Sequence, residues 1–451
     1  MKIVVIGDGK VGRAIVEQVV KEGHTVIVID KRPEIINDLV NTYDVMGIVG
    51  NGASYITQKN AGVGTANLVV SATSSDETNI LSCLVAKKLG AKATIARVRD
   101  YDYSKQINLI QNDLGINMVI NPELESATEI MNIINFPQAI RVDSFAKGNV
   151  DLVELYVPKD SPLIGQSLSE IHNKYQVKIL ICAVQRGDEV IIPTGSFVIN
   201  EGDKIHITAS KSGIRSFLHK LGLVDNKLHN IMIVGGGKIA LYLGSFLLKN
   251  KYHVKIVEIN KKRCDELSEL LPAATIINGD GTNKSVLLEE GLLNCDAFIA
   301  LTGSDEENII LSMYVHTLKN IKTITKISKS SFGDIVEAIG GVSVIKPKEI
   351  TSSRVISYIR GKNNIRGNNL VTLYQLVNNK VEALEFNVKE NSKIINTRLR
   401  DLNLKKNVLI ACIIHDGDVI IPSGNDIIEV YDSVIVITAE QIIDDLDDIL
   451  E

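Results

Sequence analysis

Short apolar runs alternate with amphipathic stretches along the first third of the chain. The apolar runs stand at Ile3–Ile6, Thr25–Ile29, Asp44–Val49, Leu68–Ser71, Thr94–Val98 and Met118–Ile120. Between them, apolar residues recur at three- and four-residue spacing, as in Gly12–Lys21 and Thr78–Leu89. This alternation predicts βαβ units and a parallel, doubly wound sheet. One more helix is predicted after Pro122, over Glu123–Asn135, ending near Pro137.

The pattern changes after this helix. Apolar runs are now separated by turns rich in Pro, Gly and Asp, without long helical stretches between them. They predict strands at Leu152–Val157, Ile179–Arg186, Glu189–Ile192 and Lys204–Thr208. We therefore expect a small α+β domain that closes near Leu221.

The whole chain is an internal repeat. The segment IVVIGDGKVG that begins at Ile3 returns as IMIVGGGKIA at Ile231, 228 residues later. TSSDETN at Thr73 returns as TGSDEEN at Thr302, and VIIPTG in the first small domain returns as VIIPSG, both 229 residues later. A two-domain unit thus occurs twice. We expect Rossmann domains at 1–137 and 228–365, small α+β domains at 138–224 and 366–451, and a linker at Asp225-Asn226-Lys227.

Composition narrows the class of protein. The 451 residues are 45% hydrophobic and 23% charged, as in ordinary soluble proteins. A formal net charge of -5 argues against nucleic-acid binding. The five cysteines show no metal-ligand spacing, which predicts buried free thiols in a reducing compartment. The chain opens directly on a strand and has no apolar run of transmembrane length, so we expect a cytoplasmic protein.

The first glycine-rich segment predicts a nucleotide site, because it follows a strand and opens a helix. In GDGKVG (Gly7, Asp8, Gly9, Lys10, Val11 and Gly12), Gly7 permits the tight turn, Gly9 admits phosphates to the backbone, and Gly12 allows close helix packing. Asp30 ends the second strand, 23 residues after Gly7. A carboxylate there can accept hydrogen bonds from both ribose hydroxyls and repels a 2′-phosphate. NAD(H) or an adenosine nucleotide is therefore favoured over NADP, although the adjacent Lys31 softens that exclusion.

The second copy carries an altered version of the same segment, with Ala in place of the third glycine. Glu258 stands 23 residues after Gly235, in the place of Asp30. We expect this site to bind nucleotide as well, the alternative being a site kept only as scaffold. The candidate residues are Gly235, Gly237, Lys238, Ile239, Ala240 and Glu258.

Further candidates follow the later strands, at the sheet edge where such folds bind ligands. Asn51 and Asp280 would lie near the adenine, and Thr73 and Thr302 in the crevice. Arg97 and its counterpart Lys326, like Lys10 and Lys238, could contact a phosphate or be solvated surface cations. Both interpretations of these four cations stay open.

No catalytic group accompanies the predicted nucleotide sites. The eight histidines form no constellation with Ser, Cys or Asp, and no metal-binding motif is present. We therefore predict a protein that is not an enzyme and has no metal site. An NAD-dependent oxidoreductase is the alternative, and a free-standing nucleotide sensor a third possibility.

The tandem arrangement resembles the TrkA family of Trk potassium-uptake systems, whose RCK (KTN) domains regulate potassium conductance. The resemblance rests on VIGDGKVG from Val5, GNGA from Gly50, Ala72-Thr73, Ala96-Arg97-Val98 and the Ile-Ile-Pro strands of both small domains. It spans essentially the whole chain. Asn51, where many relatives have Asp, and Ala240 depart from the family pattern.

The resemblance implies a regulatory subunit that binds NAD(H) or, alternatively, ATP/ADP. It implies a homotetrameric ring of Rossmann domains, peripherally associated with the inner face of the cell membrane on a potassium-translocating, TrkH-like subunit. Nucleotide binding would shift the conformation of the ring and gate the pore. The helix after Pro122, and its echo after Pro347, would pack between neighbouring Rossmann domains through Ile130, Met131, Ile133 and Ile134, or else be ordinary intramolecular helices.

Overall fold

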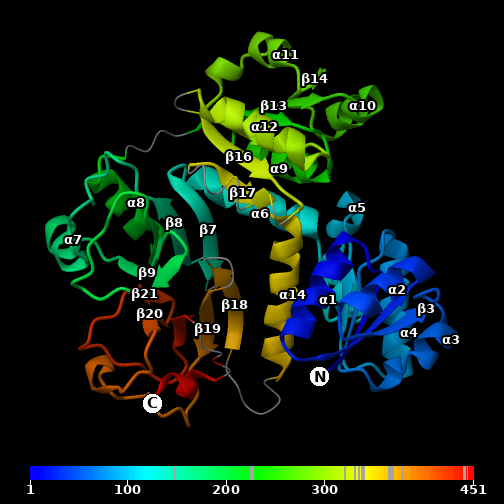
Figure 1. Ribbon diagram of the computed structural model, residues 1–451, viewed down its shortest axis with the longest axis horizontal. Helices are drawn as coiled ribbons and strands as arrows, with labels where there is room; N and C mark the ends of the chain where they lie inside the picture. Colours follow the sequence, from blue (N-terminus) through cyan, green and yellow to red (C-terminus); the bar gives the residue numbers. More distant parts are fainter. Residues whose placement is uncertain are drawn as a thin grey trace.

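Four sheets organise the chain in the computed structural model (Figure 1). The structure describes residues 1–145, 149–223, 228–318, 321–329, 332–333, 336, 341–363, 370–376, 380–439, 443 and 445–451. Two sheets are parallel and two are antiparallel, and each parallel sheet precedes an antiparallel one. The predicted tandem architecture is confirmed. The predicted linker at Asp225-Asn226-Lys227 lies outside the described residues.

The first parallel sheet has the strand order β3-β2-β1-β4-β5-β6. Strands β2 and β3 are added on one side of β1 and strands β4 to β6 on the other, so the strand order switches between β1 and β4. Its strands are β1 (Lys2–Ile6), β2 (Thr25–Asp30), β3 (Met46–Val49), β4 (Leu68–Ser71), β5 (Thr94–Arg97) and β6 (Met118–Ile120). Its helices are α1 (Lys10–Lys21), α2 (Pro33–Thr42), α3 (Tyr55–Asn60), α4 (Asp76–Leu89), α5 (Tyr101–Ser104) and α6 (Pro122–Asn135). Ile6 pairs with both Ile29 and Ser71, so three strands end level at the crevice.

The second parallel sheet repeats this order as β14-β13-β12-β15-β16-β17. Its strands are β12 (Asn230–Val234), β13 (His253–Glu258), β14 (Thr275–Asn278), β15 (Ala297–Ala300), β16 (Lys322–Lys326) and β17 (Ser343–Ile345). The helices described with it are α9 (Lys238–Lys249), α10 (Lys261–Leu270), α11 (Lys284–Glu289), α12 (Asp305–His316) and α14 (Pro347–Asn363).

The antiparallel sheets also share one plan. The first, β10-β9-β11-β8-β7, is built from β7 (Ala139–Phe145), β8 (Val150–Tyr156), β9 (Leu180–Arg186), β10 (Glu189–Ile191) and β11 (Lys204–Ser210), with α7 (Leu168–Tyr175) and α8 (Lys211–Lys220). The second, β18-β19-β22-β20-β21, is built from β18 (Leu370–Leu376), β19 (Val381–Asn387), β20 (Val408–His415), β21 (Asp418–Ile420) and β22 (Ser433–Ala439). Short 3-10 helices at Leu399–Asp401 and Leu446–Ile449 accompany it.

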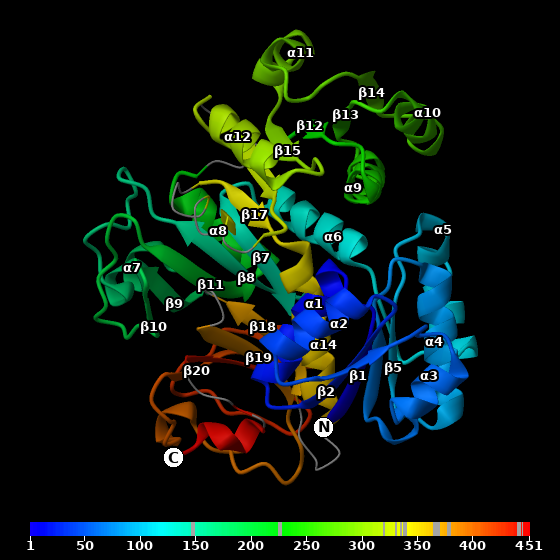
Figure 2. The same cartoon turned by 45° about the vertical axis from the view of Figure 1, so that its right-hand side comes forward.

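The last helix of each parallel sheet crosses to the other half of the chain (Figures 1 and 2). Helix α6 packs on α9, and its buried Ile130, Ile133 and Ile134 join one apolar cluster with the second sheet. Helix α14 packs on α1, and Val355, Ile356 and Ile359 join the core of the first sheet. These helices thus pack between the two Rossmann domains, and the packing is intramolecular, which was the alternative expectation.

The two small domains lie side by side (Figure 1). An apolar cluster joins them, with Phe145 and Cys182 from the first and Cys412 and Ile435 from the second. Burial of this apolar surface holds the two small domains together. Helices α6 and α14, the exchanged helices, join the two Rossmann domains in the same way.

Two further expectations concern the state of the cysteines and the absence of membrane-spanning helices. All five cysteines are buried free thiols, as predicted. In the described part of the chain, every helix is too short or too polar to cross a bilayer.

Candidate functional site

The first glycine-rich loop has the geometry that its sequence predicts. Gly7 has φ +91°, and a side chain there would place Cβ 2.8 Å from Thr73 Cγ2. At Gly12 a Cβ would lie 1.9 Å from the Gly7 carbonyl oxygen. Both glycines are therefore required by the turn and by its contact with α1. Their role is to fold the loop, whatever it binds.

The middle glycines of the two loops are different. Gly9 and Gly237 have φ of -79° and -67°, which any residue can adopt, and a Cβ at either position would meet no atom within 4 Å. Helices α1 and α9 also begin there without a side-chain cap. Each loop thus presents an open cradle before unpaired backbone N–H groups, a geometry that fits a phosphate group.

Asp30 closes the far side of the first loop. Its carboxylate accepts a hydrogen bond from the Asp8 N–H at 2.9 Å and pairs with the Arg32 guanidinium at 3.1 Å. Burial alone would raise the pKa of Asp30, but the hydrogen bonds from Arg32 and Asp8 lower it. Arg32 is itself exposed, so its guanidinium can move aside for a ribose. Asp8 is buried against Arg13, and burial raises the pKa of its carboxyl despite that contact.

Glu258 occupies the equivalent place in the second half. It accepts hydrogen bonds from the N–H groups of Gly236 at 2.6 Å and Asn260 at 2.8 Å. Arg263 donates to the Gly236 carbonyl at 2.7 Å and holds the loop from outside. The second site therefore retains the carboxylate-to-loop contact without the arginine pair of the first.

Two asparagines that sequence reasoning did not select connect the next strands. Asn79 Oδ1 accepts from the Thr73 N–H at 2.8 Å, and Asn79 Nδ2 donates to the Arg97 carbonyl at 2.9 Å. Asn308 makes the same bridge between Thr302 and Lys326. Both are fully buried and hold the ends of neighbouring strands at the crevice. The signal was present in the repeated TSSDETN and TGSDEEN segments, where the asparagine recurs at the same place.

The cations at the end of the fifth strand of each sheet are not solvated surface groups. Arg97 pairs with Glu123 of α6 at 3.5 Å, and burial lowers its pKa. Lys326 donates to the Thr302 carbonyl at 2.5 Å, and burial lowers its pKa as well. The surface interpretation is thus wrong for Arg97 and Lys326. Lys10 and Lys238 are exposed at the mouths of the loops.

The remaining candidates divide into two groups. Asn51 and Asp280 are exposed at the crevice edge and cap their own turns, through Ala53 N–H and Thr282 N–H. Lys31 is exposed beside Asp30. The side chains that turn into the apolar cores are those of Val11, Ile239 and Ala240.

Electrostatic interactions connect the two halves near their crevices. Burial lowers the pKa of Lys348, and the charge of Lys10 from the other half lowers it further; Lys10 acts on Lys326 in the same direction. Lys10 of the first loop thus repels Lys326 and Lys348 of the second half. A bound phosphate would relieve their mutual repulsion.

Tyr242 also links the halves. It lies on α9, one turn after the second loop, and its buried hydroxyl donates toward the Arg99 and Asp100 carbonyls at 3.2 and 3.3 Å. Asn121, which caps α6, donates to that hydroxyl at 3.0 Å. The helix that opens at one nucleotide loop therefore touches the strand end of the other crevice.

Comparisons with known proteins agree with this architecture. A family model described as the TrkA-N domain matches residues 3–122 and 231–347, and one described as the TrkA-C domain matches residues 152–222 and 383–451. The Trk system potassium uptake protein TrkA of Halomonas elongata is 29% identical over 98% of this chain and 96% of its own length. TrkA homolog 1 of Methanosarcina mazei is 30% identical over 97% of each chain.

Solved structures share the fold. The GsuK channel bound to NAD superposes with a TM-score of 0.65 at 16% identity, covering 97% of this chain and 77% of that chain. The GsuK RCK domain gives a TM-score of 0.64 at 17% identity, covering 97% of this chain and 92% of its own.

Proposed function

The chain belongs to the TrkA family, and on that premise we propose that it is a regulatory subunit of a potassium-uptake system, not an enzyme. It binds an adenine nucleotide in each half and gates a TrkH-like, potassium-translocating membrane protein from the cytoplasmic side. The observation that carries the nucleotide step is the pair of open cradles at Gly9 and Gly237, which the fold itself does not require. The names of the curated relatives support the potassium system as its setting.

NAD(H) is the first ligand to test, and ATP or ADP the alternative. The carboxylates of Asp30 and Glu258 are placed beside the loops, where ribose hydroxyls would lie. A solved structure of the same fold is described as a channel bound to NAD and another as bound to ADP, which supports both ligands as candidates.

We expect isothermal titration of the full chain with NADH, NAD, ATP and ADP to show saturable binding of at least one ligand. Asp30→Ala removes a hydrogen-bonding carboxylate from the first site and should weaken binding there by about tenfold or more. Glu258→Ala should do the same at the second site. Thermal unfolding of each variant controls for loop damage, since both carboxylates also hold backbone N–H groups. Absence of binding to all four nucleotides contradicts the proposal.

Gating requires that a ligand favour one arrangement of the two halves. Two features support such a response. The Tyr242 hydroxyl of α9 donates to the Arg99 carbonyl of the first half, and Lys10 of the first loop repels Lys326 and Lys348 of the second half. Binding at one site therefore acts on groups that position the other.

Tyr242→Phe should uncouple the two sites. The substitution keeps the aromatic ring but removes the hydroxyl, so the Asn121 amide and the Arg99 and Asp100 carbonyls each lose one hydrogen-bond partner. The affinity of each site alone is measured in a variant whose other loop is blocked. The coupling factor is the product of the two association constants in the unblocked chain divided by the product of these two single-site constants. We expect a coupling factor of about 5 to 150 in the parent chain, falling toward one in Tyr242→Phe. Tyr252→Phe, a change at a partly buried tyrosine of the same cluster, is the matched control. An unchanged factor in Tyr242→Phe rules out this contact as the link.

We also propose a homotetrameric ring, built through one helix of each Rossmann domain. Helix α4 exposes 51% of Leu81, and its counterpart α12 exposes 67% of Ile310 and 45% of Met313. Since each chain has two such faces, each chain can contact two neighbours, and the contacts can close into a ring.

The combined change Leu81→Glu and Ile310→Glu should split the ring, because it places charges in an apolar contact. Light scattering after size exclusion is expected to report four chains for the parent protein and one for the variant. Ile56→Glu, at a position 68% exposed on α3, should leave the tetramer intact. A tetramer that survives the double change means that other surfaces assemble it.

A further inference from the structure

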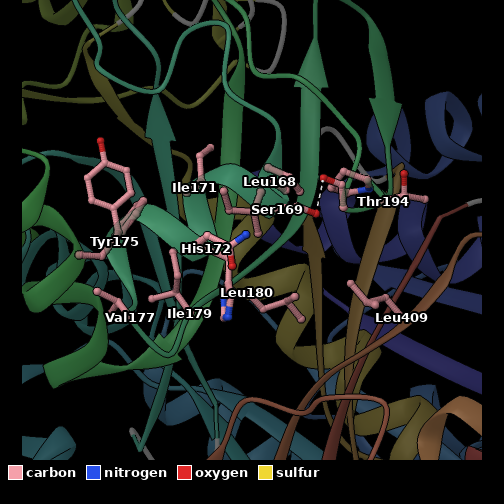
Figure 3. A pocket seen from close by; sticks show the side chains of 15 residues that line it. Leu168, Ser169, Ile171, His172, Tyr175, Val177, Ile179, Leu180, Thr194 and Leu409 are labelled. Carbon is pink, nitrogen blue, oxygen red and sulfur yellow. Dashed lines mark hydrogen bonds between the residues drawn. The ribbon is translucent and has the colours of Figure 1, made fainter.

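A cavity of about 410 Å³ opens in the first small domain, outside both glycine-rich loops (Figure 3). Its walls come from α7, β9, the turn at Pro193–Gly195 and Phe217 of α8. Leu409 of β20 reaches it from the second small domain. The volume lies within the range of about 300 to 1,000 Å³ that is typical of small-molecule sites.

The lining is mostly apolar, and it combines buried core residues with half-buried residues packed at the edge of the apolar clusters. Ile171 and Phe217 are buried in the core and form the floor. Leu168, Leu180 and Leu409 are only half-buried and face the space, so apolar surface stays in contact with water. A ligand that covered these side chains would gain the free energy of removing that surface from water.

The polar groups stand at the rim. His172 and Thr194 are exposed, and Figure 3 draws His172 between Tyr175 at one end and Thr194 and Leu409 at the other. The Ser169 hydroxyl already donates to the Gly195 carbonyl at 2.9 Å. Among the lining residues that the structure describes, none is Lys, Arg, Asp or Glu. The first turn of α7 also lines the cavity, but the N–H groups of Leu168 and Ser169 already donate to the carbonyls of Phe197 and Gly195. This chemistry disfavours a phosphate-bearing ligand, which would need cations or a helix N-terminus with free N–H groups.

Apart from Leu409, the apolar wall belongs to the first copy of the repeat. Its helix α7 spans eight residues and starts at a capping box on Ser167. The second copy has only a three-residue 3-10 helix, Leu399–Asp401, in that place. The backbone N–H of Ser169 donates to Gly195 and that of Arg400 to the equivalent Gly424, so an exposed arginine replaces Ser169 there. The two small domains have therefore diverged at this position.

We propose that this cavity binds an uncharged, largely apolar small molecule with a hydrogen-bonding group that meets His172. Because Leu409 and Leu180 line it from different small domains, an occupant contacts both and holds them together. The site is separate from the nucleotide crevices and adds a second class of ligand to the chain.

Nile red, an uncharged dye with hydrogen-bond acceptors, is a suitable probe for the full chain. We expect a saturable rise in fluorescence with one dye per chain, undiminished by saturating ATP or NADH. Leu409→Trp fills the cavity and should weaken dye binding at least about tenfold. His172→Ala removes one hydrogen bond and should weaken it about threefold. Ile164→Trp, at an exposed apolar position of the same domain outside the cavity, should change nothing.

The chain contains no tryptophan, so emission from the introduced indole shows whether it is buried. If Leu409→Trp loses its thermal transition, His172→Ala decides the matter, since His172 is exposed and outside the core. Equal dye affinity in Leu409→Trp and Ile164→Trp overturns the proposal. So does unchanged affinity in His172→Ala, or displacement of the dye by either nucleotide.

Discussion

Gly9→Asp is expected to abolish nucleotide binding at the first site without unfolding the protein. Gly9 has an extended backbone and open space at its Cβ, and it is the N-cap of α1. Asp is a favourable N-cap, so the free energy of unfolding should stay within about 1 kcal/mol of the parent value or rise. Its carboxylate, however, would stand where we place the phosphate. Repulsion at that range corresponds to a loss of about 100-fold or more in affinity.

The second loop supplies the matched variant. Gly237→Asp should remove binding at the second site alone, and the two changes together should leave no saturable binding in isothermal titration. Differential scanning calorimetry measures stability on the same samples. If Gly9→Asp binds nucleotide as the parent does, the open cradle is not a phosphate site. If it unfolds, the fold itself requires glycine at position 9.

Arg360→Met is expected to have the largest effect on stability. Arg360 lies on α14 with 6% of its side chain exposed, and it joins Glu22 of the first half to Glu382 of the second small domain. Burial opposes its charge, but the two carboxylates raise the pKa of Arg360 overall. Methionine keeps the packing stem and removes the charge, which leaves two carboxylates without their partner. The expected loss is about 3–5 kcal/mol in the free energy of unfolding, measured by urea denaturation.

A rescue experiment separates the charge from the packing. Adding Glu22→Gln and Glu382→Gln to Arg360→Met removes the unpaired charges and should recover most of the lost stability. A loss below about 1 kcal/mol in Arg360→Met would mean that α14 is held by its apolar face alone. Failure of the triple variant to recover would show that the cost comes from packing.

Local patterns predict most of the architecture, because the residues within a segment largely determine whether it forms a strand, a helix or a turn. Most strands of the first parallel sheet are apolar runs, and the glycines at positions 7 and 12 follow from backbone geometry at those positions. The repeat then carries this reading to the second half. Strand β7 is missed, since Arg141 and Asp143 interrupt its apolar pattern. In the fold these two residues pair at 2.9 Å, so their charges are tolerated in a sheet.

Contacts between the halves are not predictable in this way. The repeat counterpart of Tyr242 is Ala14. Comparison of the two copies therefore shows that this position differs, but not which residues Tyr242 contacts. Arg360 and Glu22 are 338 residues apart, and only the exchange of α6 and α14 brings them together. Asn79 recurs in both copies but looks like a helix residue until the strand ends are seen around it. The residues of each nucleotide site can be predicted from local sequence, whereas the contacts that couple the two sites depend on the tertiary fold.

The most direct test of the regulatory proposal is potassium flux through the membrane partner. The partner would be captured with the tagged full chain, reconstituted into proteoliposomes, and assayed with and without the nucleotide that titration identifies. We predict that the nucleotide changes flux with the parent chain and has no effect with the Gly9→Asp, Gly237→Asp double variant, which still binds the partner. Equal nucleotide responses with both chains, or flux indifferent to the presence of this chain, would contradict a nucleotide-dependent gating subunit.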